Sequence, residues 1–207
     1  MRNNGKSKAG SVCLIIGAVL LLSCVCWFLH ISRESSKAGE ISHQKLVLVK
    51  EYVDNITVSS EETKSSFEAK EETAPLKEMT IVDIDGCPYI GYLAIPSLDL
   101  EMPVADTWDE EILKTSLCRY YGSFITDDMV IAGHNYSSSF GKLNDLATGD
   151  EVYFTDMNGE VYLYEVSDIE VLKGTDITAM TDTEFDLSLY TCTFGGKDRL
   201  TIRCLRK

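Results

Sequence analysis

The chain has 207 residues, of which 44% are hydrophobic and 25% are charged, and its formal net charge at pH 7 is −14. A chain of this length normally holds one or two domains. The acidic balance argues against a phosphate-binding surface, because proteins that bind nucleic acids concentrate Lys and Arg. We therefore expect no nucleic-acid partner and attribute the acidity to solubility.

The first 31 residues have the pattern of a membrane anchor. Residues 1–11 include Arg2, Lys6 and Lys8 without an acidic residue, and residues 12–31 are almost continuously apolar. Twenty helical residues extend about 30 Å, the thickness of a bilayer core. The basic residues predict a cytoplasmic N-terminus and a single-pass anchor in the cell membrane, with the rest of the chain extracellular. A cleaved signal peptide is the alternative, but the apolar run is long and no small-residue cleavage site follows it.

Residues 32–80 are polar and rich in Glu, Lys and Ser. This composition buries little surface and predicts an extracellular stalk. Apolar residues nevertheless recur within it at near-helical spacing, at Ile41, Leu46, Val49, Val53 and Ile56. We interpret the segment as a spacer with transient helix, and the alternative is a regulatory segment that covers a catalytic groove.

Residues 81–207 have the pattern of a small β domain. Asn158-Gly159 is a strong signal for a tight turn between two strands. Many short strands with only brief helices predict a mainly β fold that closes, or nearly closes, into a barrel. Before the C-terminal hairpin, strands are predicted at residues 90–95, 98–104, 129–132, 152–154, 161–164 and 169–171.

Two short helices are predicted between these strands. Thr107 is followed three residues later by Glu110, which fits a capping box and predicts a helix that turns Leu117 inward. Residues 120–128 are expected to form a loop. A second helical turn is indicated by the three-residue spacing of Phe140, Leu143 and Leu146.

The C-terminal hairpin carries the most informative residues. Its turn is predicted at residues 195–198, which places Cys192 opposite Thr201 and Leu189 opposite Cys204. In this register one face carries Cys192, Arg199, Thr201 and Arg203, and the core face carries Leu189, Leu200, Ile202 and Cys204. The first face therefore holds a thiol within reach of a guanidinium group.

A reactive thiol needs a basic or cationic neighbour, because the nucleophile is the thiolate. Of the three histidines, His30 ends the apolar run and His43 lies in the stalk. His134 remains, and it follows a buried-looking strand that ends at a glycine, where a loop can project a side chain into a cleft. Taken singly, Cys192, His134 and Arg199 are better explained as structural residues.

Together, these residues form a recognisable set. Leu189-Tyr-Thr191-Cys192 is followed after a short turn by Arg199, and Val130-Ile-Ala-Gly-His134-Asn135 lies upstream. With Gly91-Tyr-Leu-Ala-Ile-Pro96 near the domain start, the set resembles the sortases, the membrane-anchored cysteine transpeptidases of Gram-positive bacteria. The resemblance covers roughly residues 89–207 and implies a sortase-like closed β-barrel.

The resemblance also implies a mechanism. Cys192 would attack a sorting-signal peptide of the Leu-Pro-x-Thr-Gly or Asn-Pro-x-Thr-x type and form a thioester. His134 would act as acid and base, Arg199 would stabilise the oxyanion, and Thr191 would contact substrate. Arg203 is the competing assignment for Arg199. No cofactor is expected.

The implied partners are surface proteins with a C-terminal sorting signal and an amine of a cell-wall precursor or a pilin. The stalk lacks an Asp-Pro-aromatic lid of the kind found in pilin-polymerising sortases, which favours attachment of single proteins. Two other function classes stay open, a membrane-tethered cysteine peptidase and a surface binding module without chemistry.

Two further features have competing interpretations. The acidic residues 173–186 form either a solvated loop or a groove wall that holds calcium, and we expect no metal because their spacing matches no compact calcium loop. Outside the apolar run the chain has four cysteines. We interpret Cys192 as a free thiol and the other three as structural, although a bridge between Cys87 and Cys118 is not excluded.

Overall fold

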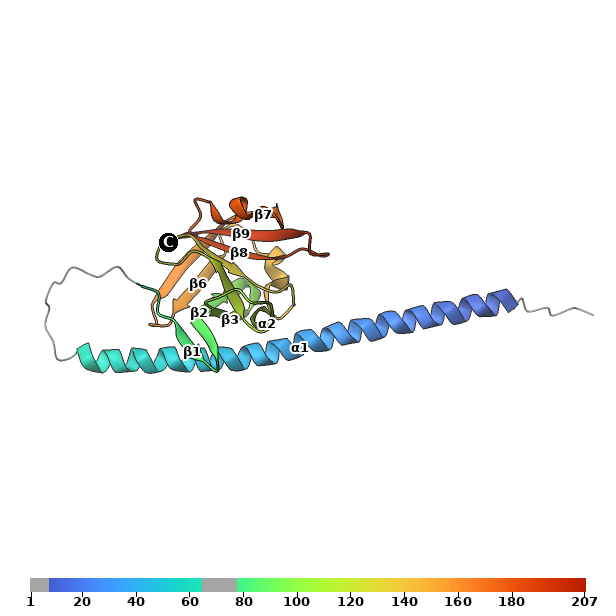
Figure 1. The fold of residues 1–207 in the computed structure, drawn as a ribbon, viewed down its shortest axis with the longest axis horizontal. Helices are drawn as coiled ribbons and strands as arrows, with labels where there is room; N and C mark the ends of the chain where they lie inside the picture. Colours follow the sequence, from blue (N-terminus) through green and yellow to red (C-terminus); the bar gives the residue numbers. More distant parts are fainter. Residues whose placement is uncertain (1–7, 65–77) are drawn as a thin grey trace, which may run out of the picture. The chain divides into compact units, whose positions relative to one another are not determined.

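The computed structural model describes residues 8–64 and 78–207 (Figure 1). It divides into two compact units, Met1–Lys37 and Ala38–Lys207, and each is considered by itself. The first seven residues of the predicted cytoplasmic segment, and residues 65–77 of the predicted stalk, lie outside the described residues.

The first unit consists of the N-terminal part of helix α1 (Lys8–Lys64). Its apolar side chains are exposed, including Leu14, Leu21 and Phe28. By length and composition this part of α1 could cross a membrane, in agreement with the apolar run found in the sequence.

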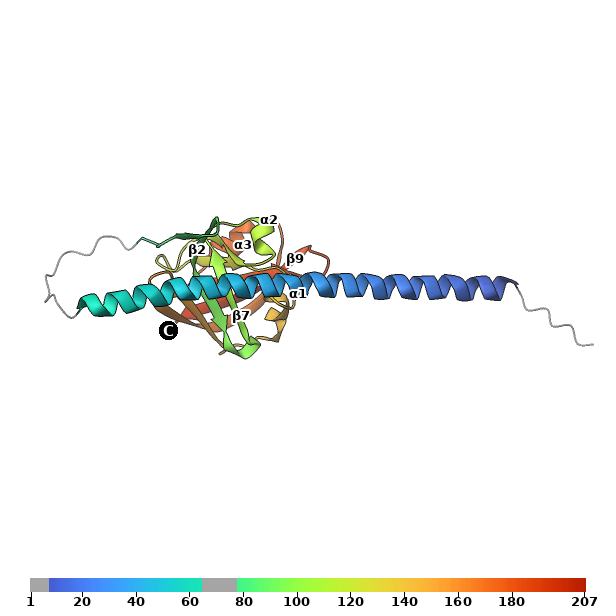
Figure 2. The ribbon, with the colours of Figure 1, turned by 90° about the horizontal axis from the view of Figure 1, so that it is seen from below.

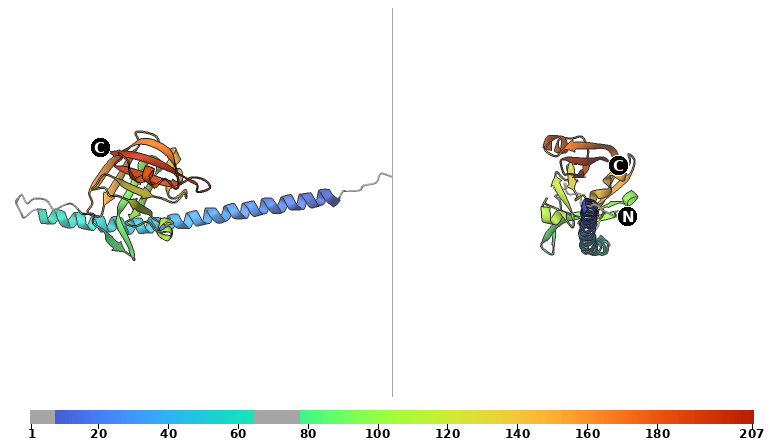
Figure 3. Two further views of the ribbon diagram at one scale, coloured as in Figure 1. Left: turned by 45° about the horizontal axis from the view of Figure 1, so that its top comes forward. Right: turned by 90° about the vertical axis from the view of Figure 1, so that its right-hand side faces the viewer.

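The second unit is built on a closed barrel of eight strands (Figures 1 and 3). The order of the strands is β2-β3-β4-β5-β8-β9-β7-β6, and pairing between β2 and β6 closes the ring. A ninth strand, β1 (Val82–Ile84), extends the sheet beside β2. The barrel strands are β2 (Cys87–Ile95), β3 (Leu100–Ala105), β4 (Leu117–Tyr121), β5 (Met129–Ala132), β6 (Glu151–Asp156), β7 (Val161–Lys173), β8 (Leu187–Cys192) and β9 (Asp198–Arg206). The predicted closed β-barrel is therefore confirmed.

Closure of the barrel depends on close contact between β2 and β6. Gly91 has φ of 149°, and a Cβ there would lie 2.0 Å from the carbonyl oxygen of Thr155. Only glycine fits this contact. The barrel interior is filled by apolar side chains from every wall, which supply the main driving force for folding. The largest fully buried ones include Phe124, Phe140, Phe154, Ile90, Leu93 and Ile131.

The connections differ from prediction in three places. Helix α2 (Glu110–Leu113) is a single turn capped by Asp109, whose carboxylate accepts hydrogen bonds from two backbone N–H groups at 2.8 and 3.0 Å. The predicted cap at Thr107 was therefore wrong. Leu117 is buried as predicted, but it belongs to strand β4 and not to the helix. Strand β4 also includes Tyr120 and Tyr121, which were predicted to begin the loop at 120–128.

Other elements lie close to their expected places. The 3₁₀ helix η1 (Pro96–Leu98) precedes β3, and η2 (Phe140–Asp145) buries Phe140 and Leu143 as predicted. Strand β7 joins two segments that were predicted as separate strands, with a register shift between Val166 and Asp168. Such a bulge hides the continuity of a strand because it interrupts the alternation of its side chains.

Residues of α1 from Ala38 onward belong to the same compact unit as the barrel, and these residues lie along the outside of β2 and β3 (Figures 1 and 2). Val49 and Val53 are buried against Tyr89 and Met157. Lys50 forms an ion pair with Glu101 at 2.6 Å, and Lys45 donates a hydrogen bond to Thr115 at 2.7 Å. This part of the chain therefore differs from the predicted spacer.

Candidate active site

Cys192 is the last residue of β8, which lies between β5 and β9 in the sheet. On one side β5 runs parallel, with Ala132 paired to Tyr190, and the N–H of Gly133 donates to the carbonyl of Tyr190 at 3.0 Å. His134 and Cys192 each follow this pair by two residues. Both residues therefore lie at the carboxyl ends of two paired parallel strands.

On the other side, Cys192 pairs directly with Arg199 of β9. The hairpin turn is closed by the N–H of Thr193, which donates to the carbonyl of Asp198 at 3.0 Å. The predicted register, with Cys192 opposite Thr201, was wrong by two residues. Because side chains alternate with a period of two, this shift leaves the predicted faces of the hairpin unchanged. It brings Arg199 nearer to Cys192 than expected.

The turn that carries His134 is fixed by tight packing. A Cβ at Gly133 would lie 2.3 Å from the ring of Phe140, so only glycine allows this contact. The hydroxyl of Thr191 donates to the carbonyl of Gly133 at 2.9 Å, and the residue is 3% exposed. This burial does not support the predicted substrate contact of Thr191, since its hydroxyl is already used inside the protein.

The imidazole of His134 lies in a partly dehydrated setting. It stacks on the ring of Tyr136 with centroids 3.7 Å apart, and its Nδ1 is buried without a hydrogen-bond partner among the described residues. Burial lowers the pKa of His134 below its usual 6.5, and the charge of Lys114 lowers it further, against a smaller opposing effect of Glu110. The ring is therefore mostly neutral at pH 7 and able to accept a proton.

The four cysteines of the barrel unit differ in exposure. Cys192 is exposed, whereas Cys87, Cys118 and Cys204 are buried, and all four are free thiols. Burial raises the pKa of Cys118 to about 11 and that of Cys204 to about 12, which makes these thiols inert. Cys192 is thus the accessible thiol of the barrel.

The two candidate arginines occupy different environments. Arg203 is 1% exposed and forms an ion pair with Glu170 at 2.7 Å, so its guanidinium is not available to a ligand. Arg199 is partly exposed and donates to the backbone carbonyls of Gly196 and Asp198 at 2.9 and 3.1 Å. These contacts hold its guanidinium near the turn that follows Cys192.

Arg199 also lines a cavity of about 170 Å³. Cys192 does not line the cavity but lies directly opposite Arg199 and two residues from Tyr190, which does. The wall combines aromatic and aliphatic side chains with three charged residues, Lys173, Asp176 and Arg199. The cavity is lined by Trp108, Tyr120, Lys173, Gly174, Asp176, Ile177, Met180, Tyr190 and Arg199.

Sequence reasoning did not identify this cavity. Trp108 and Tyr120 come from segments predicted as a helix start and a loop. Ile177 and Met180 belong to helix α3 (Ile177–Thr181), inside the acidic segment for which a solvated loop was favoured over a groove wall. The sequence did contain one indication of the cavity, because Ile177 and Met180 are large apolar residues within an acidic segment. Apolar residues in a loop often line a binding site.

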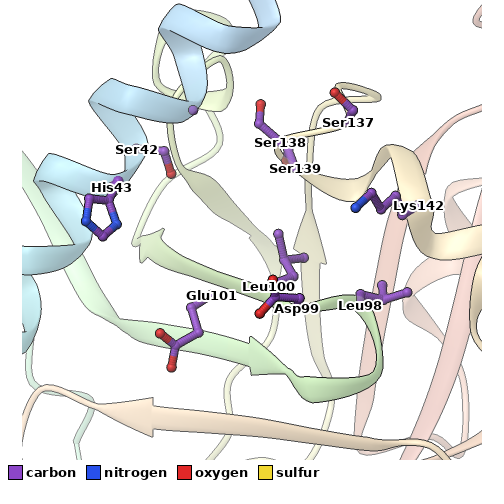
Figure 4. Close-up of a pocket in the computed structure, with 11 residues that line it drawn as sticks. Ser42, His43, Leu98, Asp99, Leu100, Glu101, Ser137, Ser138, Ser139 and Lys142 are labelled. Atoms are coloured by element: carbon purple, nitrogen blue, oxygen red, sulfur yellow. The ribbon is translucent and has the colours of Figure 1, made fainter.

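A second cavity, of about 180 Å³, lies between α1 and the two 3₁₀ helices (Figure 4). Its wall is polar and includes Ser42, His43, Asp99, Ser139 and Lys142. None of Cys192, His134 and Arg199 lines it. Among the described residues no three potential metal-ligating side chains lie together.

Comparison with known proteins identifies the family of the barrel. Residues 93–207, more than half of the chain, match the family model of the sortase domain. The chain belongs to the sortase family. No curated protein matches it in sequence.

Several solved sortases share its fold. Sortase A from Corynebacterium diphtheriae is 28% identical with a TM-score of 0.52, over 58% of this chain and 61% of that one. Sortase C1 from Streptococcus agalactiae is also 28% identical with a TM-score of 0.52, over 60% and 70% of the two chains. A Clostridium perfringens sortase D5 transpeptidase is similar in fold over 81% of this chain and 99% of that one, with 21% identity and a TM-score of 0.57.

Proposed function

We propose that this sortase is a cysteine transpeptidase in which Cys192, His134 and Arg199 perform the reaction. The observation that carries the proposal is the placement of the exposed Cys192 at the end of β8. It is paired with Arg199 on one side, and His134 follows the end of the parallel strand β5 on the other. A nucleophile, a proton carrier and a cationic donor are the three groups that acyl transfer through a thiol requires.

In the first half of the reaction the neutral His134 accepts the proton of the Cys192 thiol. The thiolate attacks the carbonyl carbon of the donor peptide, and the charge that develops on the oxygen is stabilised by the Arg199 guanidinium. His134 then gives its proton to the departing amine as the C–N bond breaks. The product is a thioester between the donor peptide and Cys192.

In the second half an incoming amine attacks the thioester. His134 removes a proton from this amine, the new amide bond forms, and the C–S bond breaks. The Cys192 thiolate leaves and regains a proton from His134. The enzyme returns to its starting state without a cofactor.

The donor peptide that we propose is a C-terminal sorting signal of a surface protein, with a Leu-Pro-x-Thr-Gly-like or Asn-Pro-x-Thr-x-like motif. The cavity beside Arg199 supports this choice, because its aromatic and aliphatic wall suits an apolar side chain near the scissile bond. The acceptor is an amine of a cell-wall precursor or a pilin.

We further propose that the apolar part of α1 anchors the enzyme in the cell membrane, with its N-terminus inside and the barrel outside. The exposed apolar residues of this part and the basic residues that precede it support this orientation.

Turnover of defined peptides tests the proposed function. The full chain in detergent is incubated with fluorogenic peptides of both motif types and with triglycine as the amine, beside a Cys192→Ala control. We expect cleavage with a ligated product that is absent in the control. Hydrolysis without ligation at high amine would favour a cysteine peptidase, and a failure to turn over any peptide would favour a binding module.

A further inference from the structure

Arg203 is a buried cation in the middle of β9 whose partners reach across three segments. Its Nε donates to Glu170 of β7 at 2.7 Å, and its Nη1 donates to the hydroxyl of Ser188 of β8 at 2.7 Å. The same guanidinium donates to the backbone carbonyls of Ala179 and Met180 in α3. These contacts tie β7, β8 and α3 to one buried side chain.

Helix α3 depends on these contacts. It has five residues and lies in the connection between β7 and β8, and a helix of this length is not stable by itself. Its first turn is capped by Asp176, whose carboxylate accepts from the N–H of Ala179 at 3.1 Å. The carbonyls near its C-terminal end would lack helical partners, and Arg203 supplies donors and a positive charge to them.

The same helix forms one wall of the cavity beside Arg199. Ile177 and Met180 line this cavity, and the backbone of Met180 is itself held by Arg203 at 3.2 Å. The aromatic ring of Phe185, at the other end of the connection, lies 5.6 Å from the guanidinium of Arg203. Arg203 therefore fixes the position of this wall without entering the cavity.

We propose that Arg203 is a positioning residue that holds α3 as the wall of the cavity beside Arg199 and thereby sets the selectivity of the enzyme for an apolar side chain of the donor peptide. This inference rests on the proposed function. The contacts of Arg203 are with Glu170, Ser188, Phe185 and the backbone of α3, not with Cys192. Its loss is therefore expected to act on peptide recognition and to leave the reactivity of the thiol unchanged.

Substitution Arg203→Lys tests the proposal. Lysine keeps the charge but presents a single ammonium group, which cannot reach all four partners in the geometry of a guanidinium. Two peptides that differ only in the apolar residue of the sorting motif, with Leu or Ala, are compared by kcat and KM. We expect KM for the Leu peptide to rise about tenfold and the preference for Leu over Ala to shrink, because one well-packed apolar group is worth roughly 10- to 200-fold in selectivity.

Two further readouts separate positioning from general damage. The rate of alkylation of Cys192 by iodoacetamide is expected to stay unchanged, while amide hydrogen exchange at residues 177–181 is expected to become faster. The matched control is Arg206→Lys, because Arg206 also lies in β9 and also binds a backbone carbonyl, that of Phe124, far along the chain from α3. This control is expected to leave the peptide preference and the exchange of α3 unchanged.

An unchanged preference together with unchanged exchange of α3 would overturn the proposal. If Arg203→Lys does not fold, Phe185→Leu removes the ring beside the guanidinium and is expected to give the same direction of change in both readouts. A wild-type enzyme that turns over neither peptide would reject the proposed function, and the exchange data would then still show whether Arg203 holds α3.

Discussion

In the proposed reaction, Cys192 acts with side chains from both neighbouring strands. His134 comes from the end of β5 and Arg199 from the start of β9, and the pairing of these strands with β8 brings them to the same end of the sheet. The sequence predicted these three residues, and the strand pairing places Arg199 beside Cys192 and His134 just after the neighbouring strand. The predicted contact of Thr191 with substrate was not supported, because its hydroxyl is hydrogen-bonded to the Gly133 carbonyl inside the protein. A sequence motif does not reveal such an internal partner.

The hydroxyl of Thr191 makes a testable contribution to the position of His134. Thr191→Val keeps the shape of the side chain but loses the hydrogen bond to the Gly133 carbonyl. We expect kcat to fall about tenfold with KM little changed, because small displacements of a reacting group reduce rates strongly. Thr191→Ser is expected to restore most of the rate, and equal losses in both variants would contradict the role of the hydroxyl.

The lowered pKa of His134 predicts a pH dependence of stability. In the unfolded chain this imidazole titrates near 6.5, and in the folded protein it titrates lower, so below pH 6.5 the unfolded state binds more protons and stability falls. Well above pH 6.5 the imidazole is neutral in both the folded and the unfolded state, so its titration does not change the stability. We therefore expect wild type to lose more thermal stability than His134→Gln between pH 7.5 and pH 5.5.

Thermal unfolding of both proteins across this pH range measures the difference. The same loss in wild type and His134→Gln would show that the titration of His134 is not linked to folding. A greater loss in His134→Gln would mean that the folded protein raises the pKa of the imidazole instead.

At the scale of elements, strands were predicted well where their side chains follow a regular pattern. For example, the short apolar run that ends before Gly133 predicted a strand at residues 129–132, and these residues form β5. The hairpin register was wrong because Gly195 and Gly196 both have positive φ, and a turn rich in glycine allows more than one closing pair. Helix α3 was missed because five residues do not produce a helical period, and its stability comes from Arg203.

The packing of α1 on the barrel gives a prediction with a matched control. Val49 is fully buried against the barrel, while Val47, two residues earlier in the same helix, is 49% exposed. We expect Val49→Ala to lower the free energy of unfolding by about 2 kcal/mol and Val47→Ala to change it by less than about 0.5 kcal/mol. Equal effects in a chemical denaturation experiment would show that this part of α1 is not held on the barrel in solution.

At the scale of the whole molecule, the compact unit that contains the barrel begins at Ala38, well before the β domain that the sequence indicated. The periodic apolar residues of the predicted stalk were visible in the sequence. Their partners were not, because Tyr89 and Met157 lie on the outside of the barrel and come from distant segments. Local composition therefore favoured a spacer, although the segment has a face that the barrel covers.

This unit predicts the behaviour of truncated proteins. A protein of residues 80–207 would expose the apolar surface that Val49 and Val53 cover, whereas residues 38–207 would keep it buried. We expect the shorter protein to have a lower melting temperature and a greater tendency to aggregate, since exposed apolar patches promote association. Scattering and thermal unfolding compare the two, and equal behaviour would show that the helix adds nothing to the barrel.

The central claim is that a thioester forms at Cys192 and is passed to an amine. Intact-protein mass spectrometry measures this directly, first after addition of a sorting peptide alone and then after addition of triglycine. The account predicts an acyl adduct on wild type that maps to Cys192, is absent from Cys192→Ala, and disappears as the ligated peptide forms. Ligated product from Cys192→Ala, or an adduct on another residue that is transferred to the amine, would contradict it.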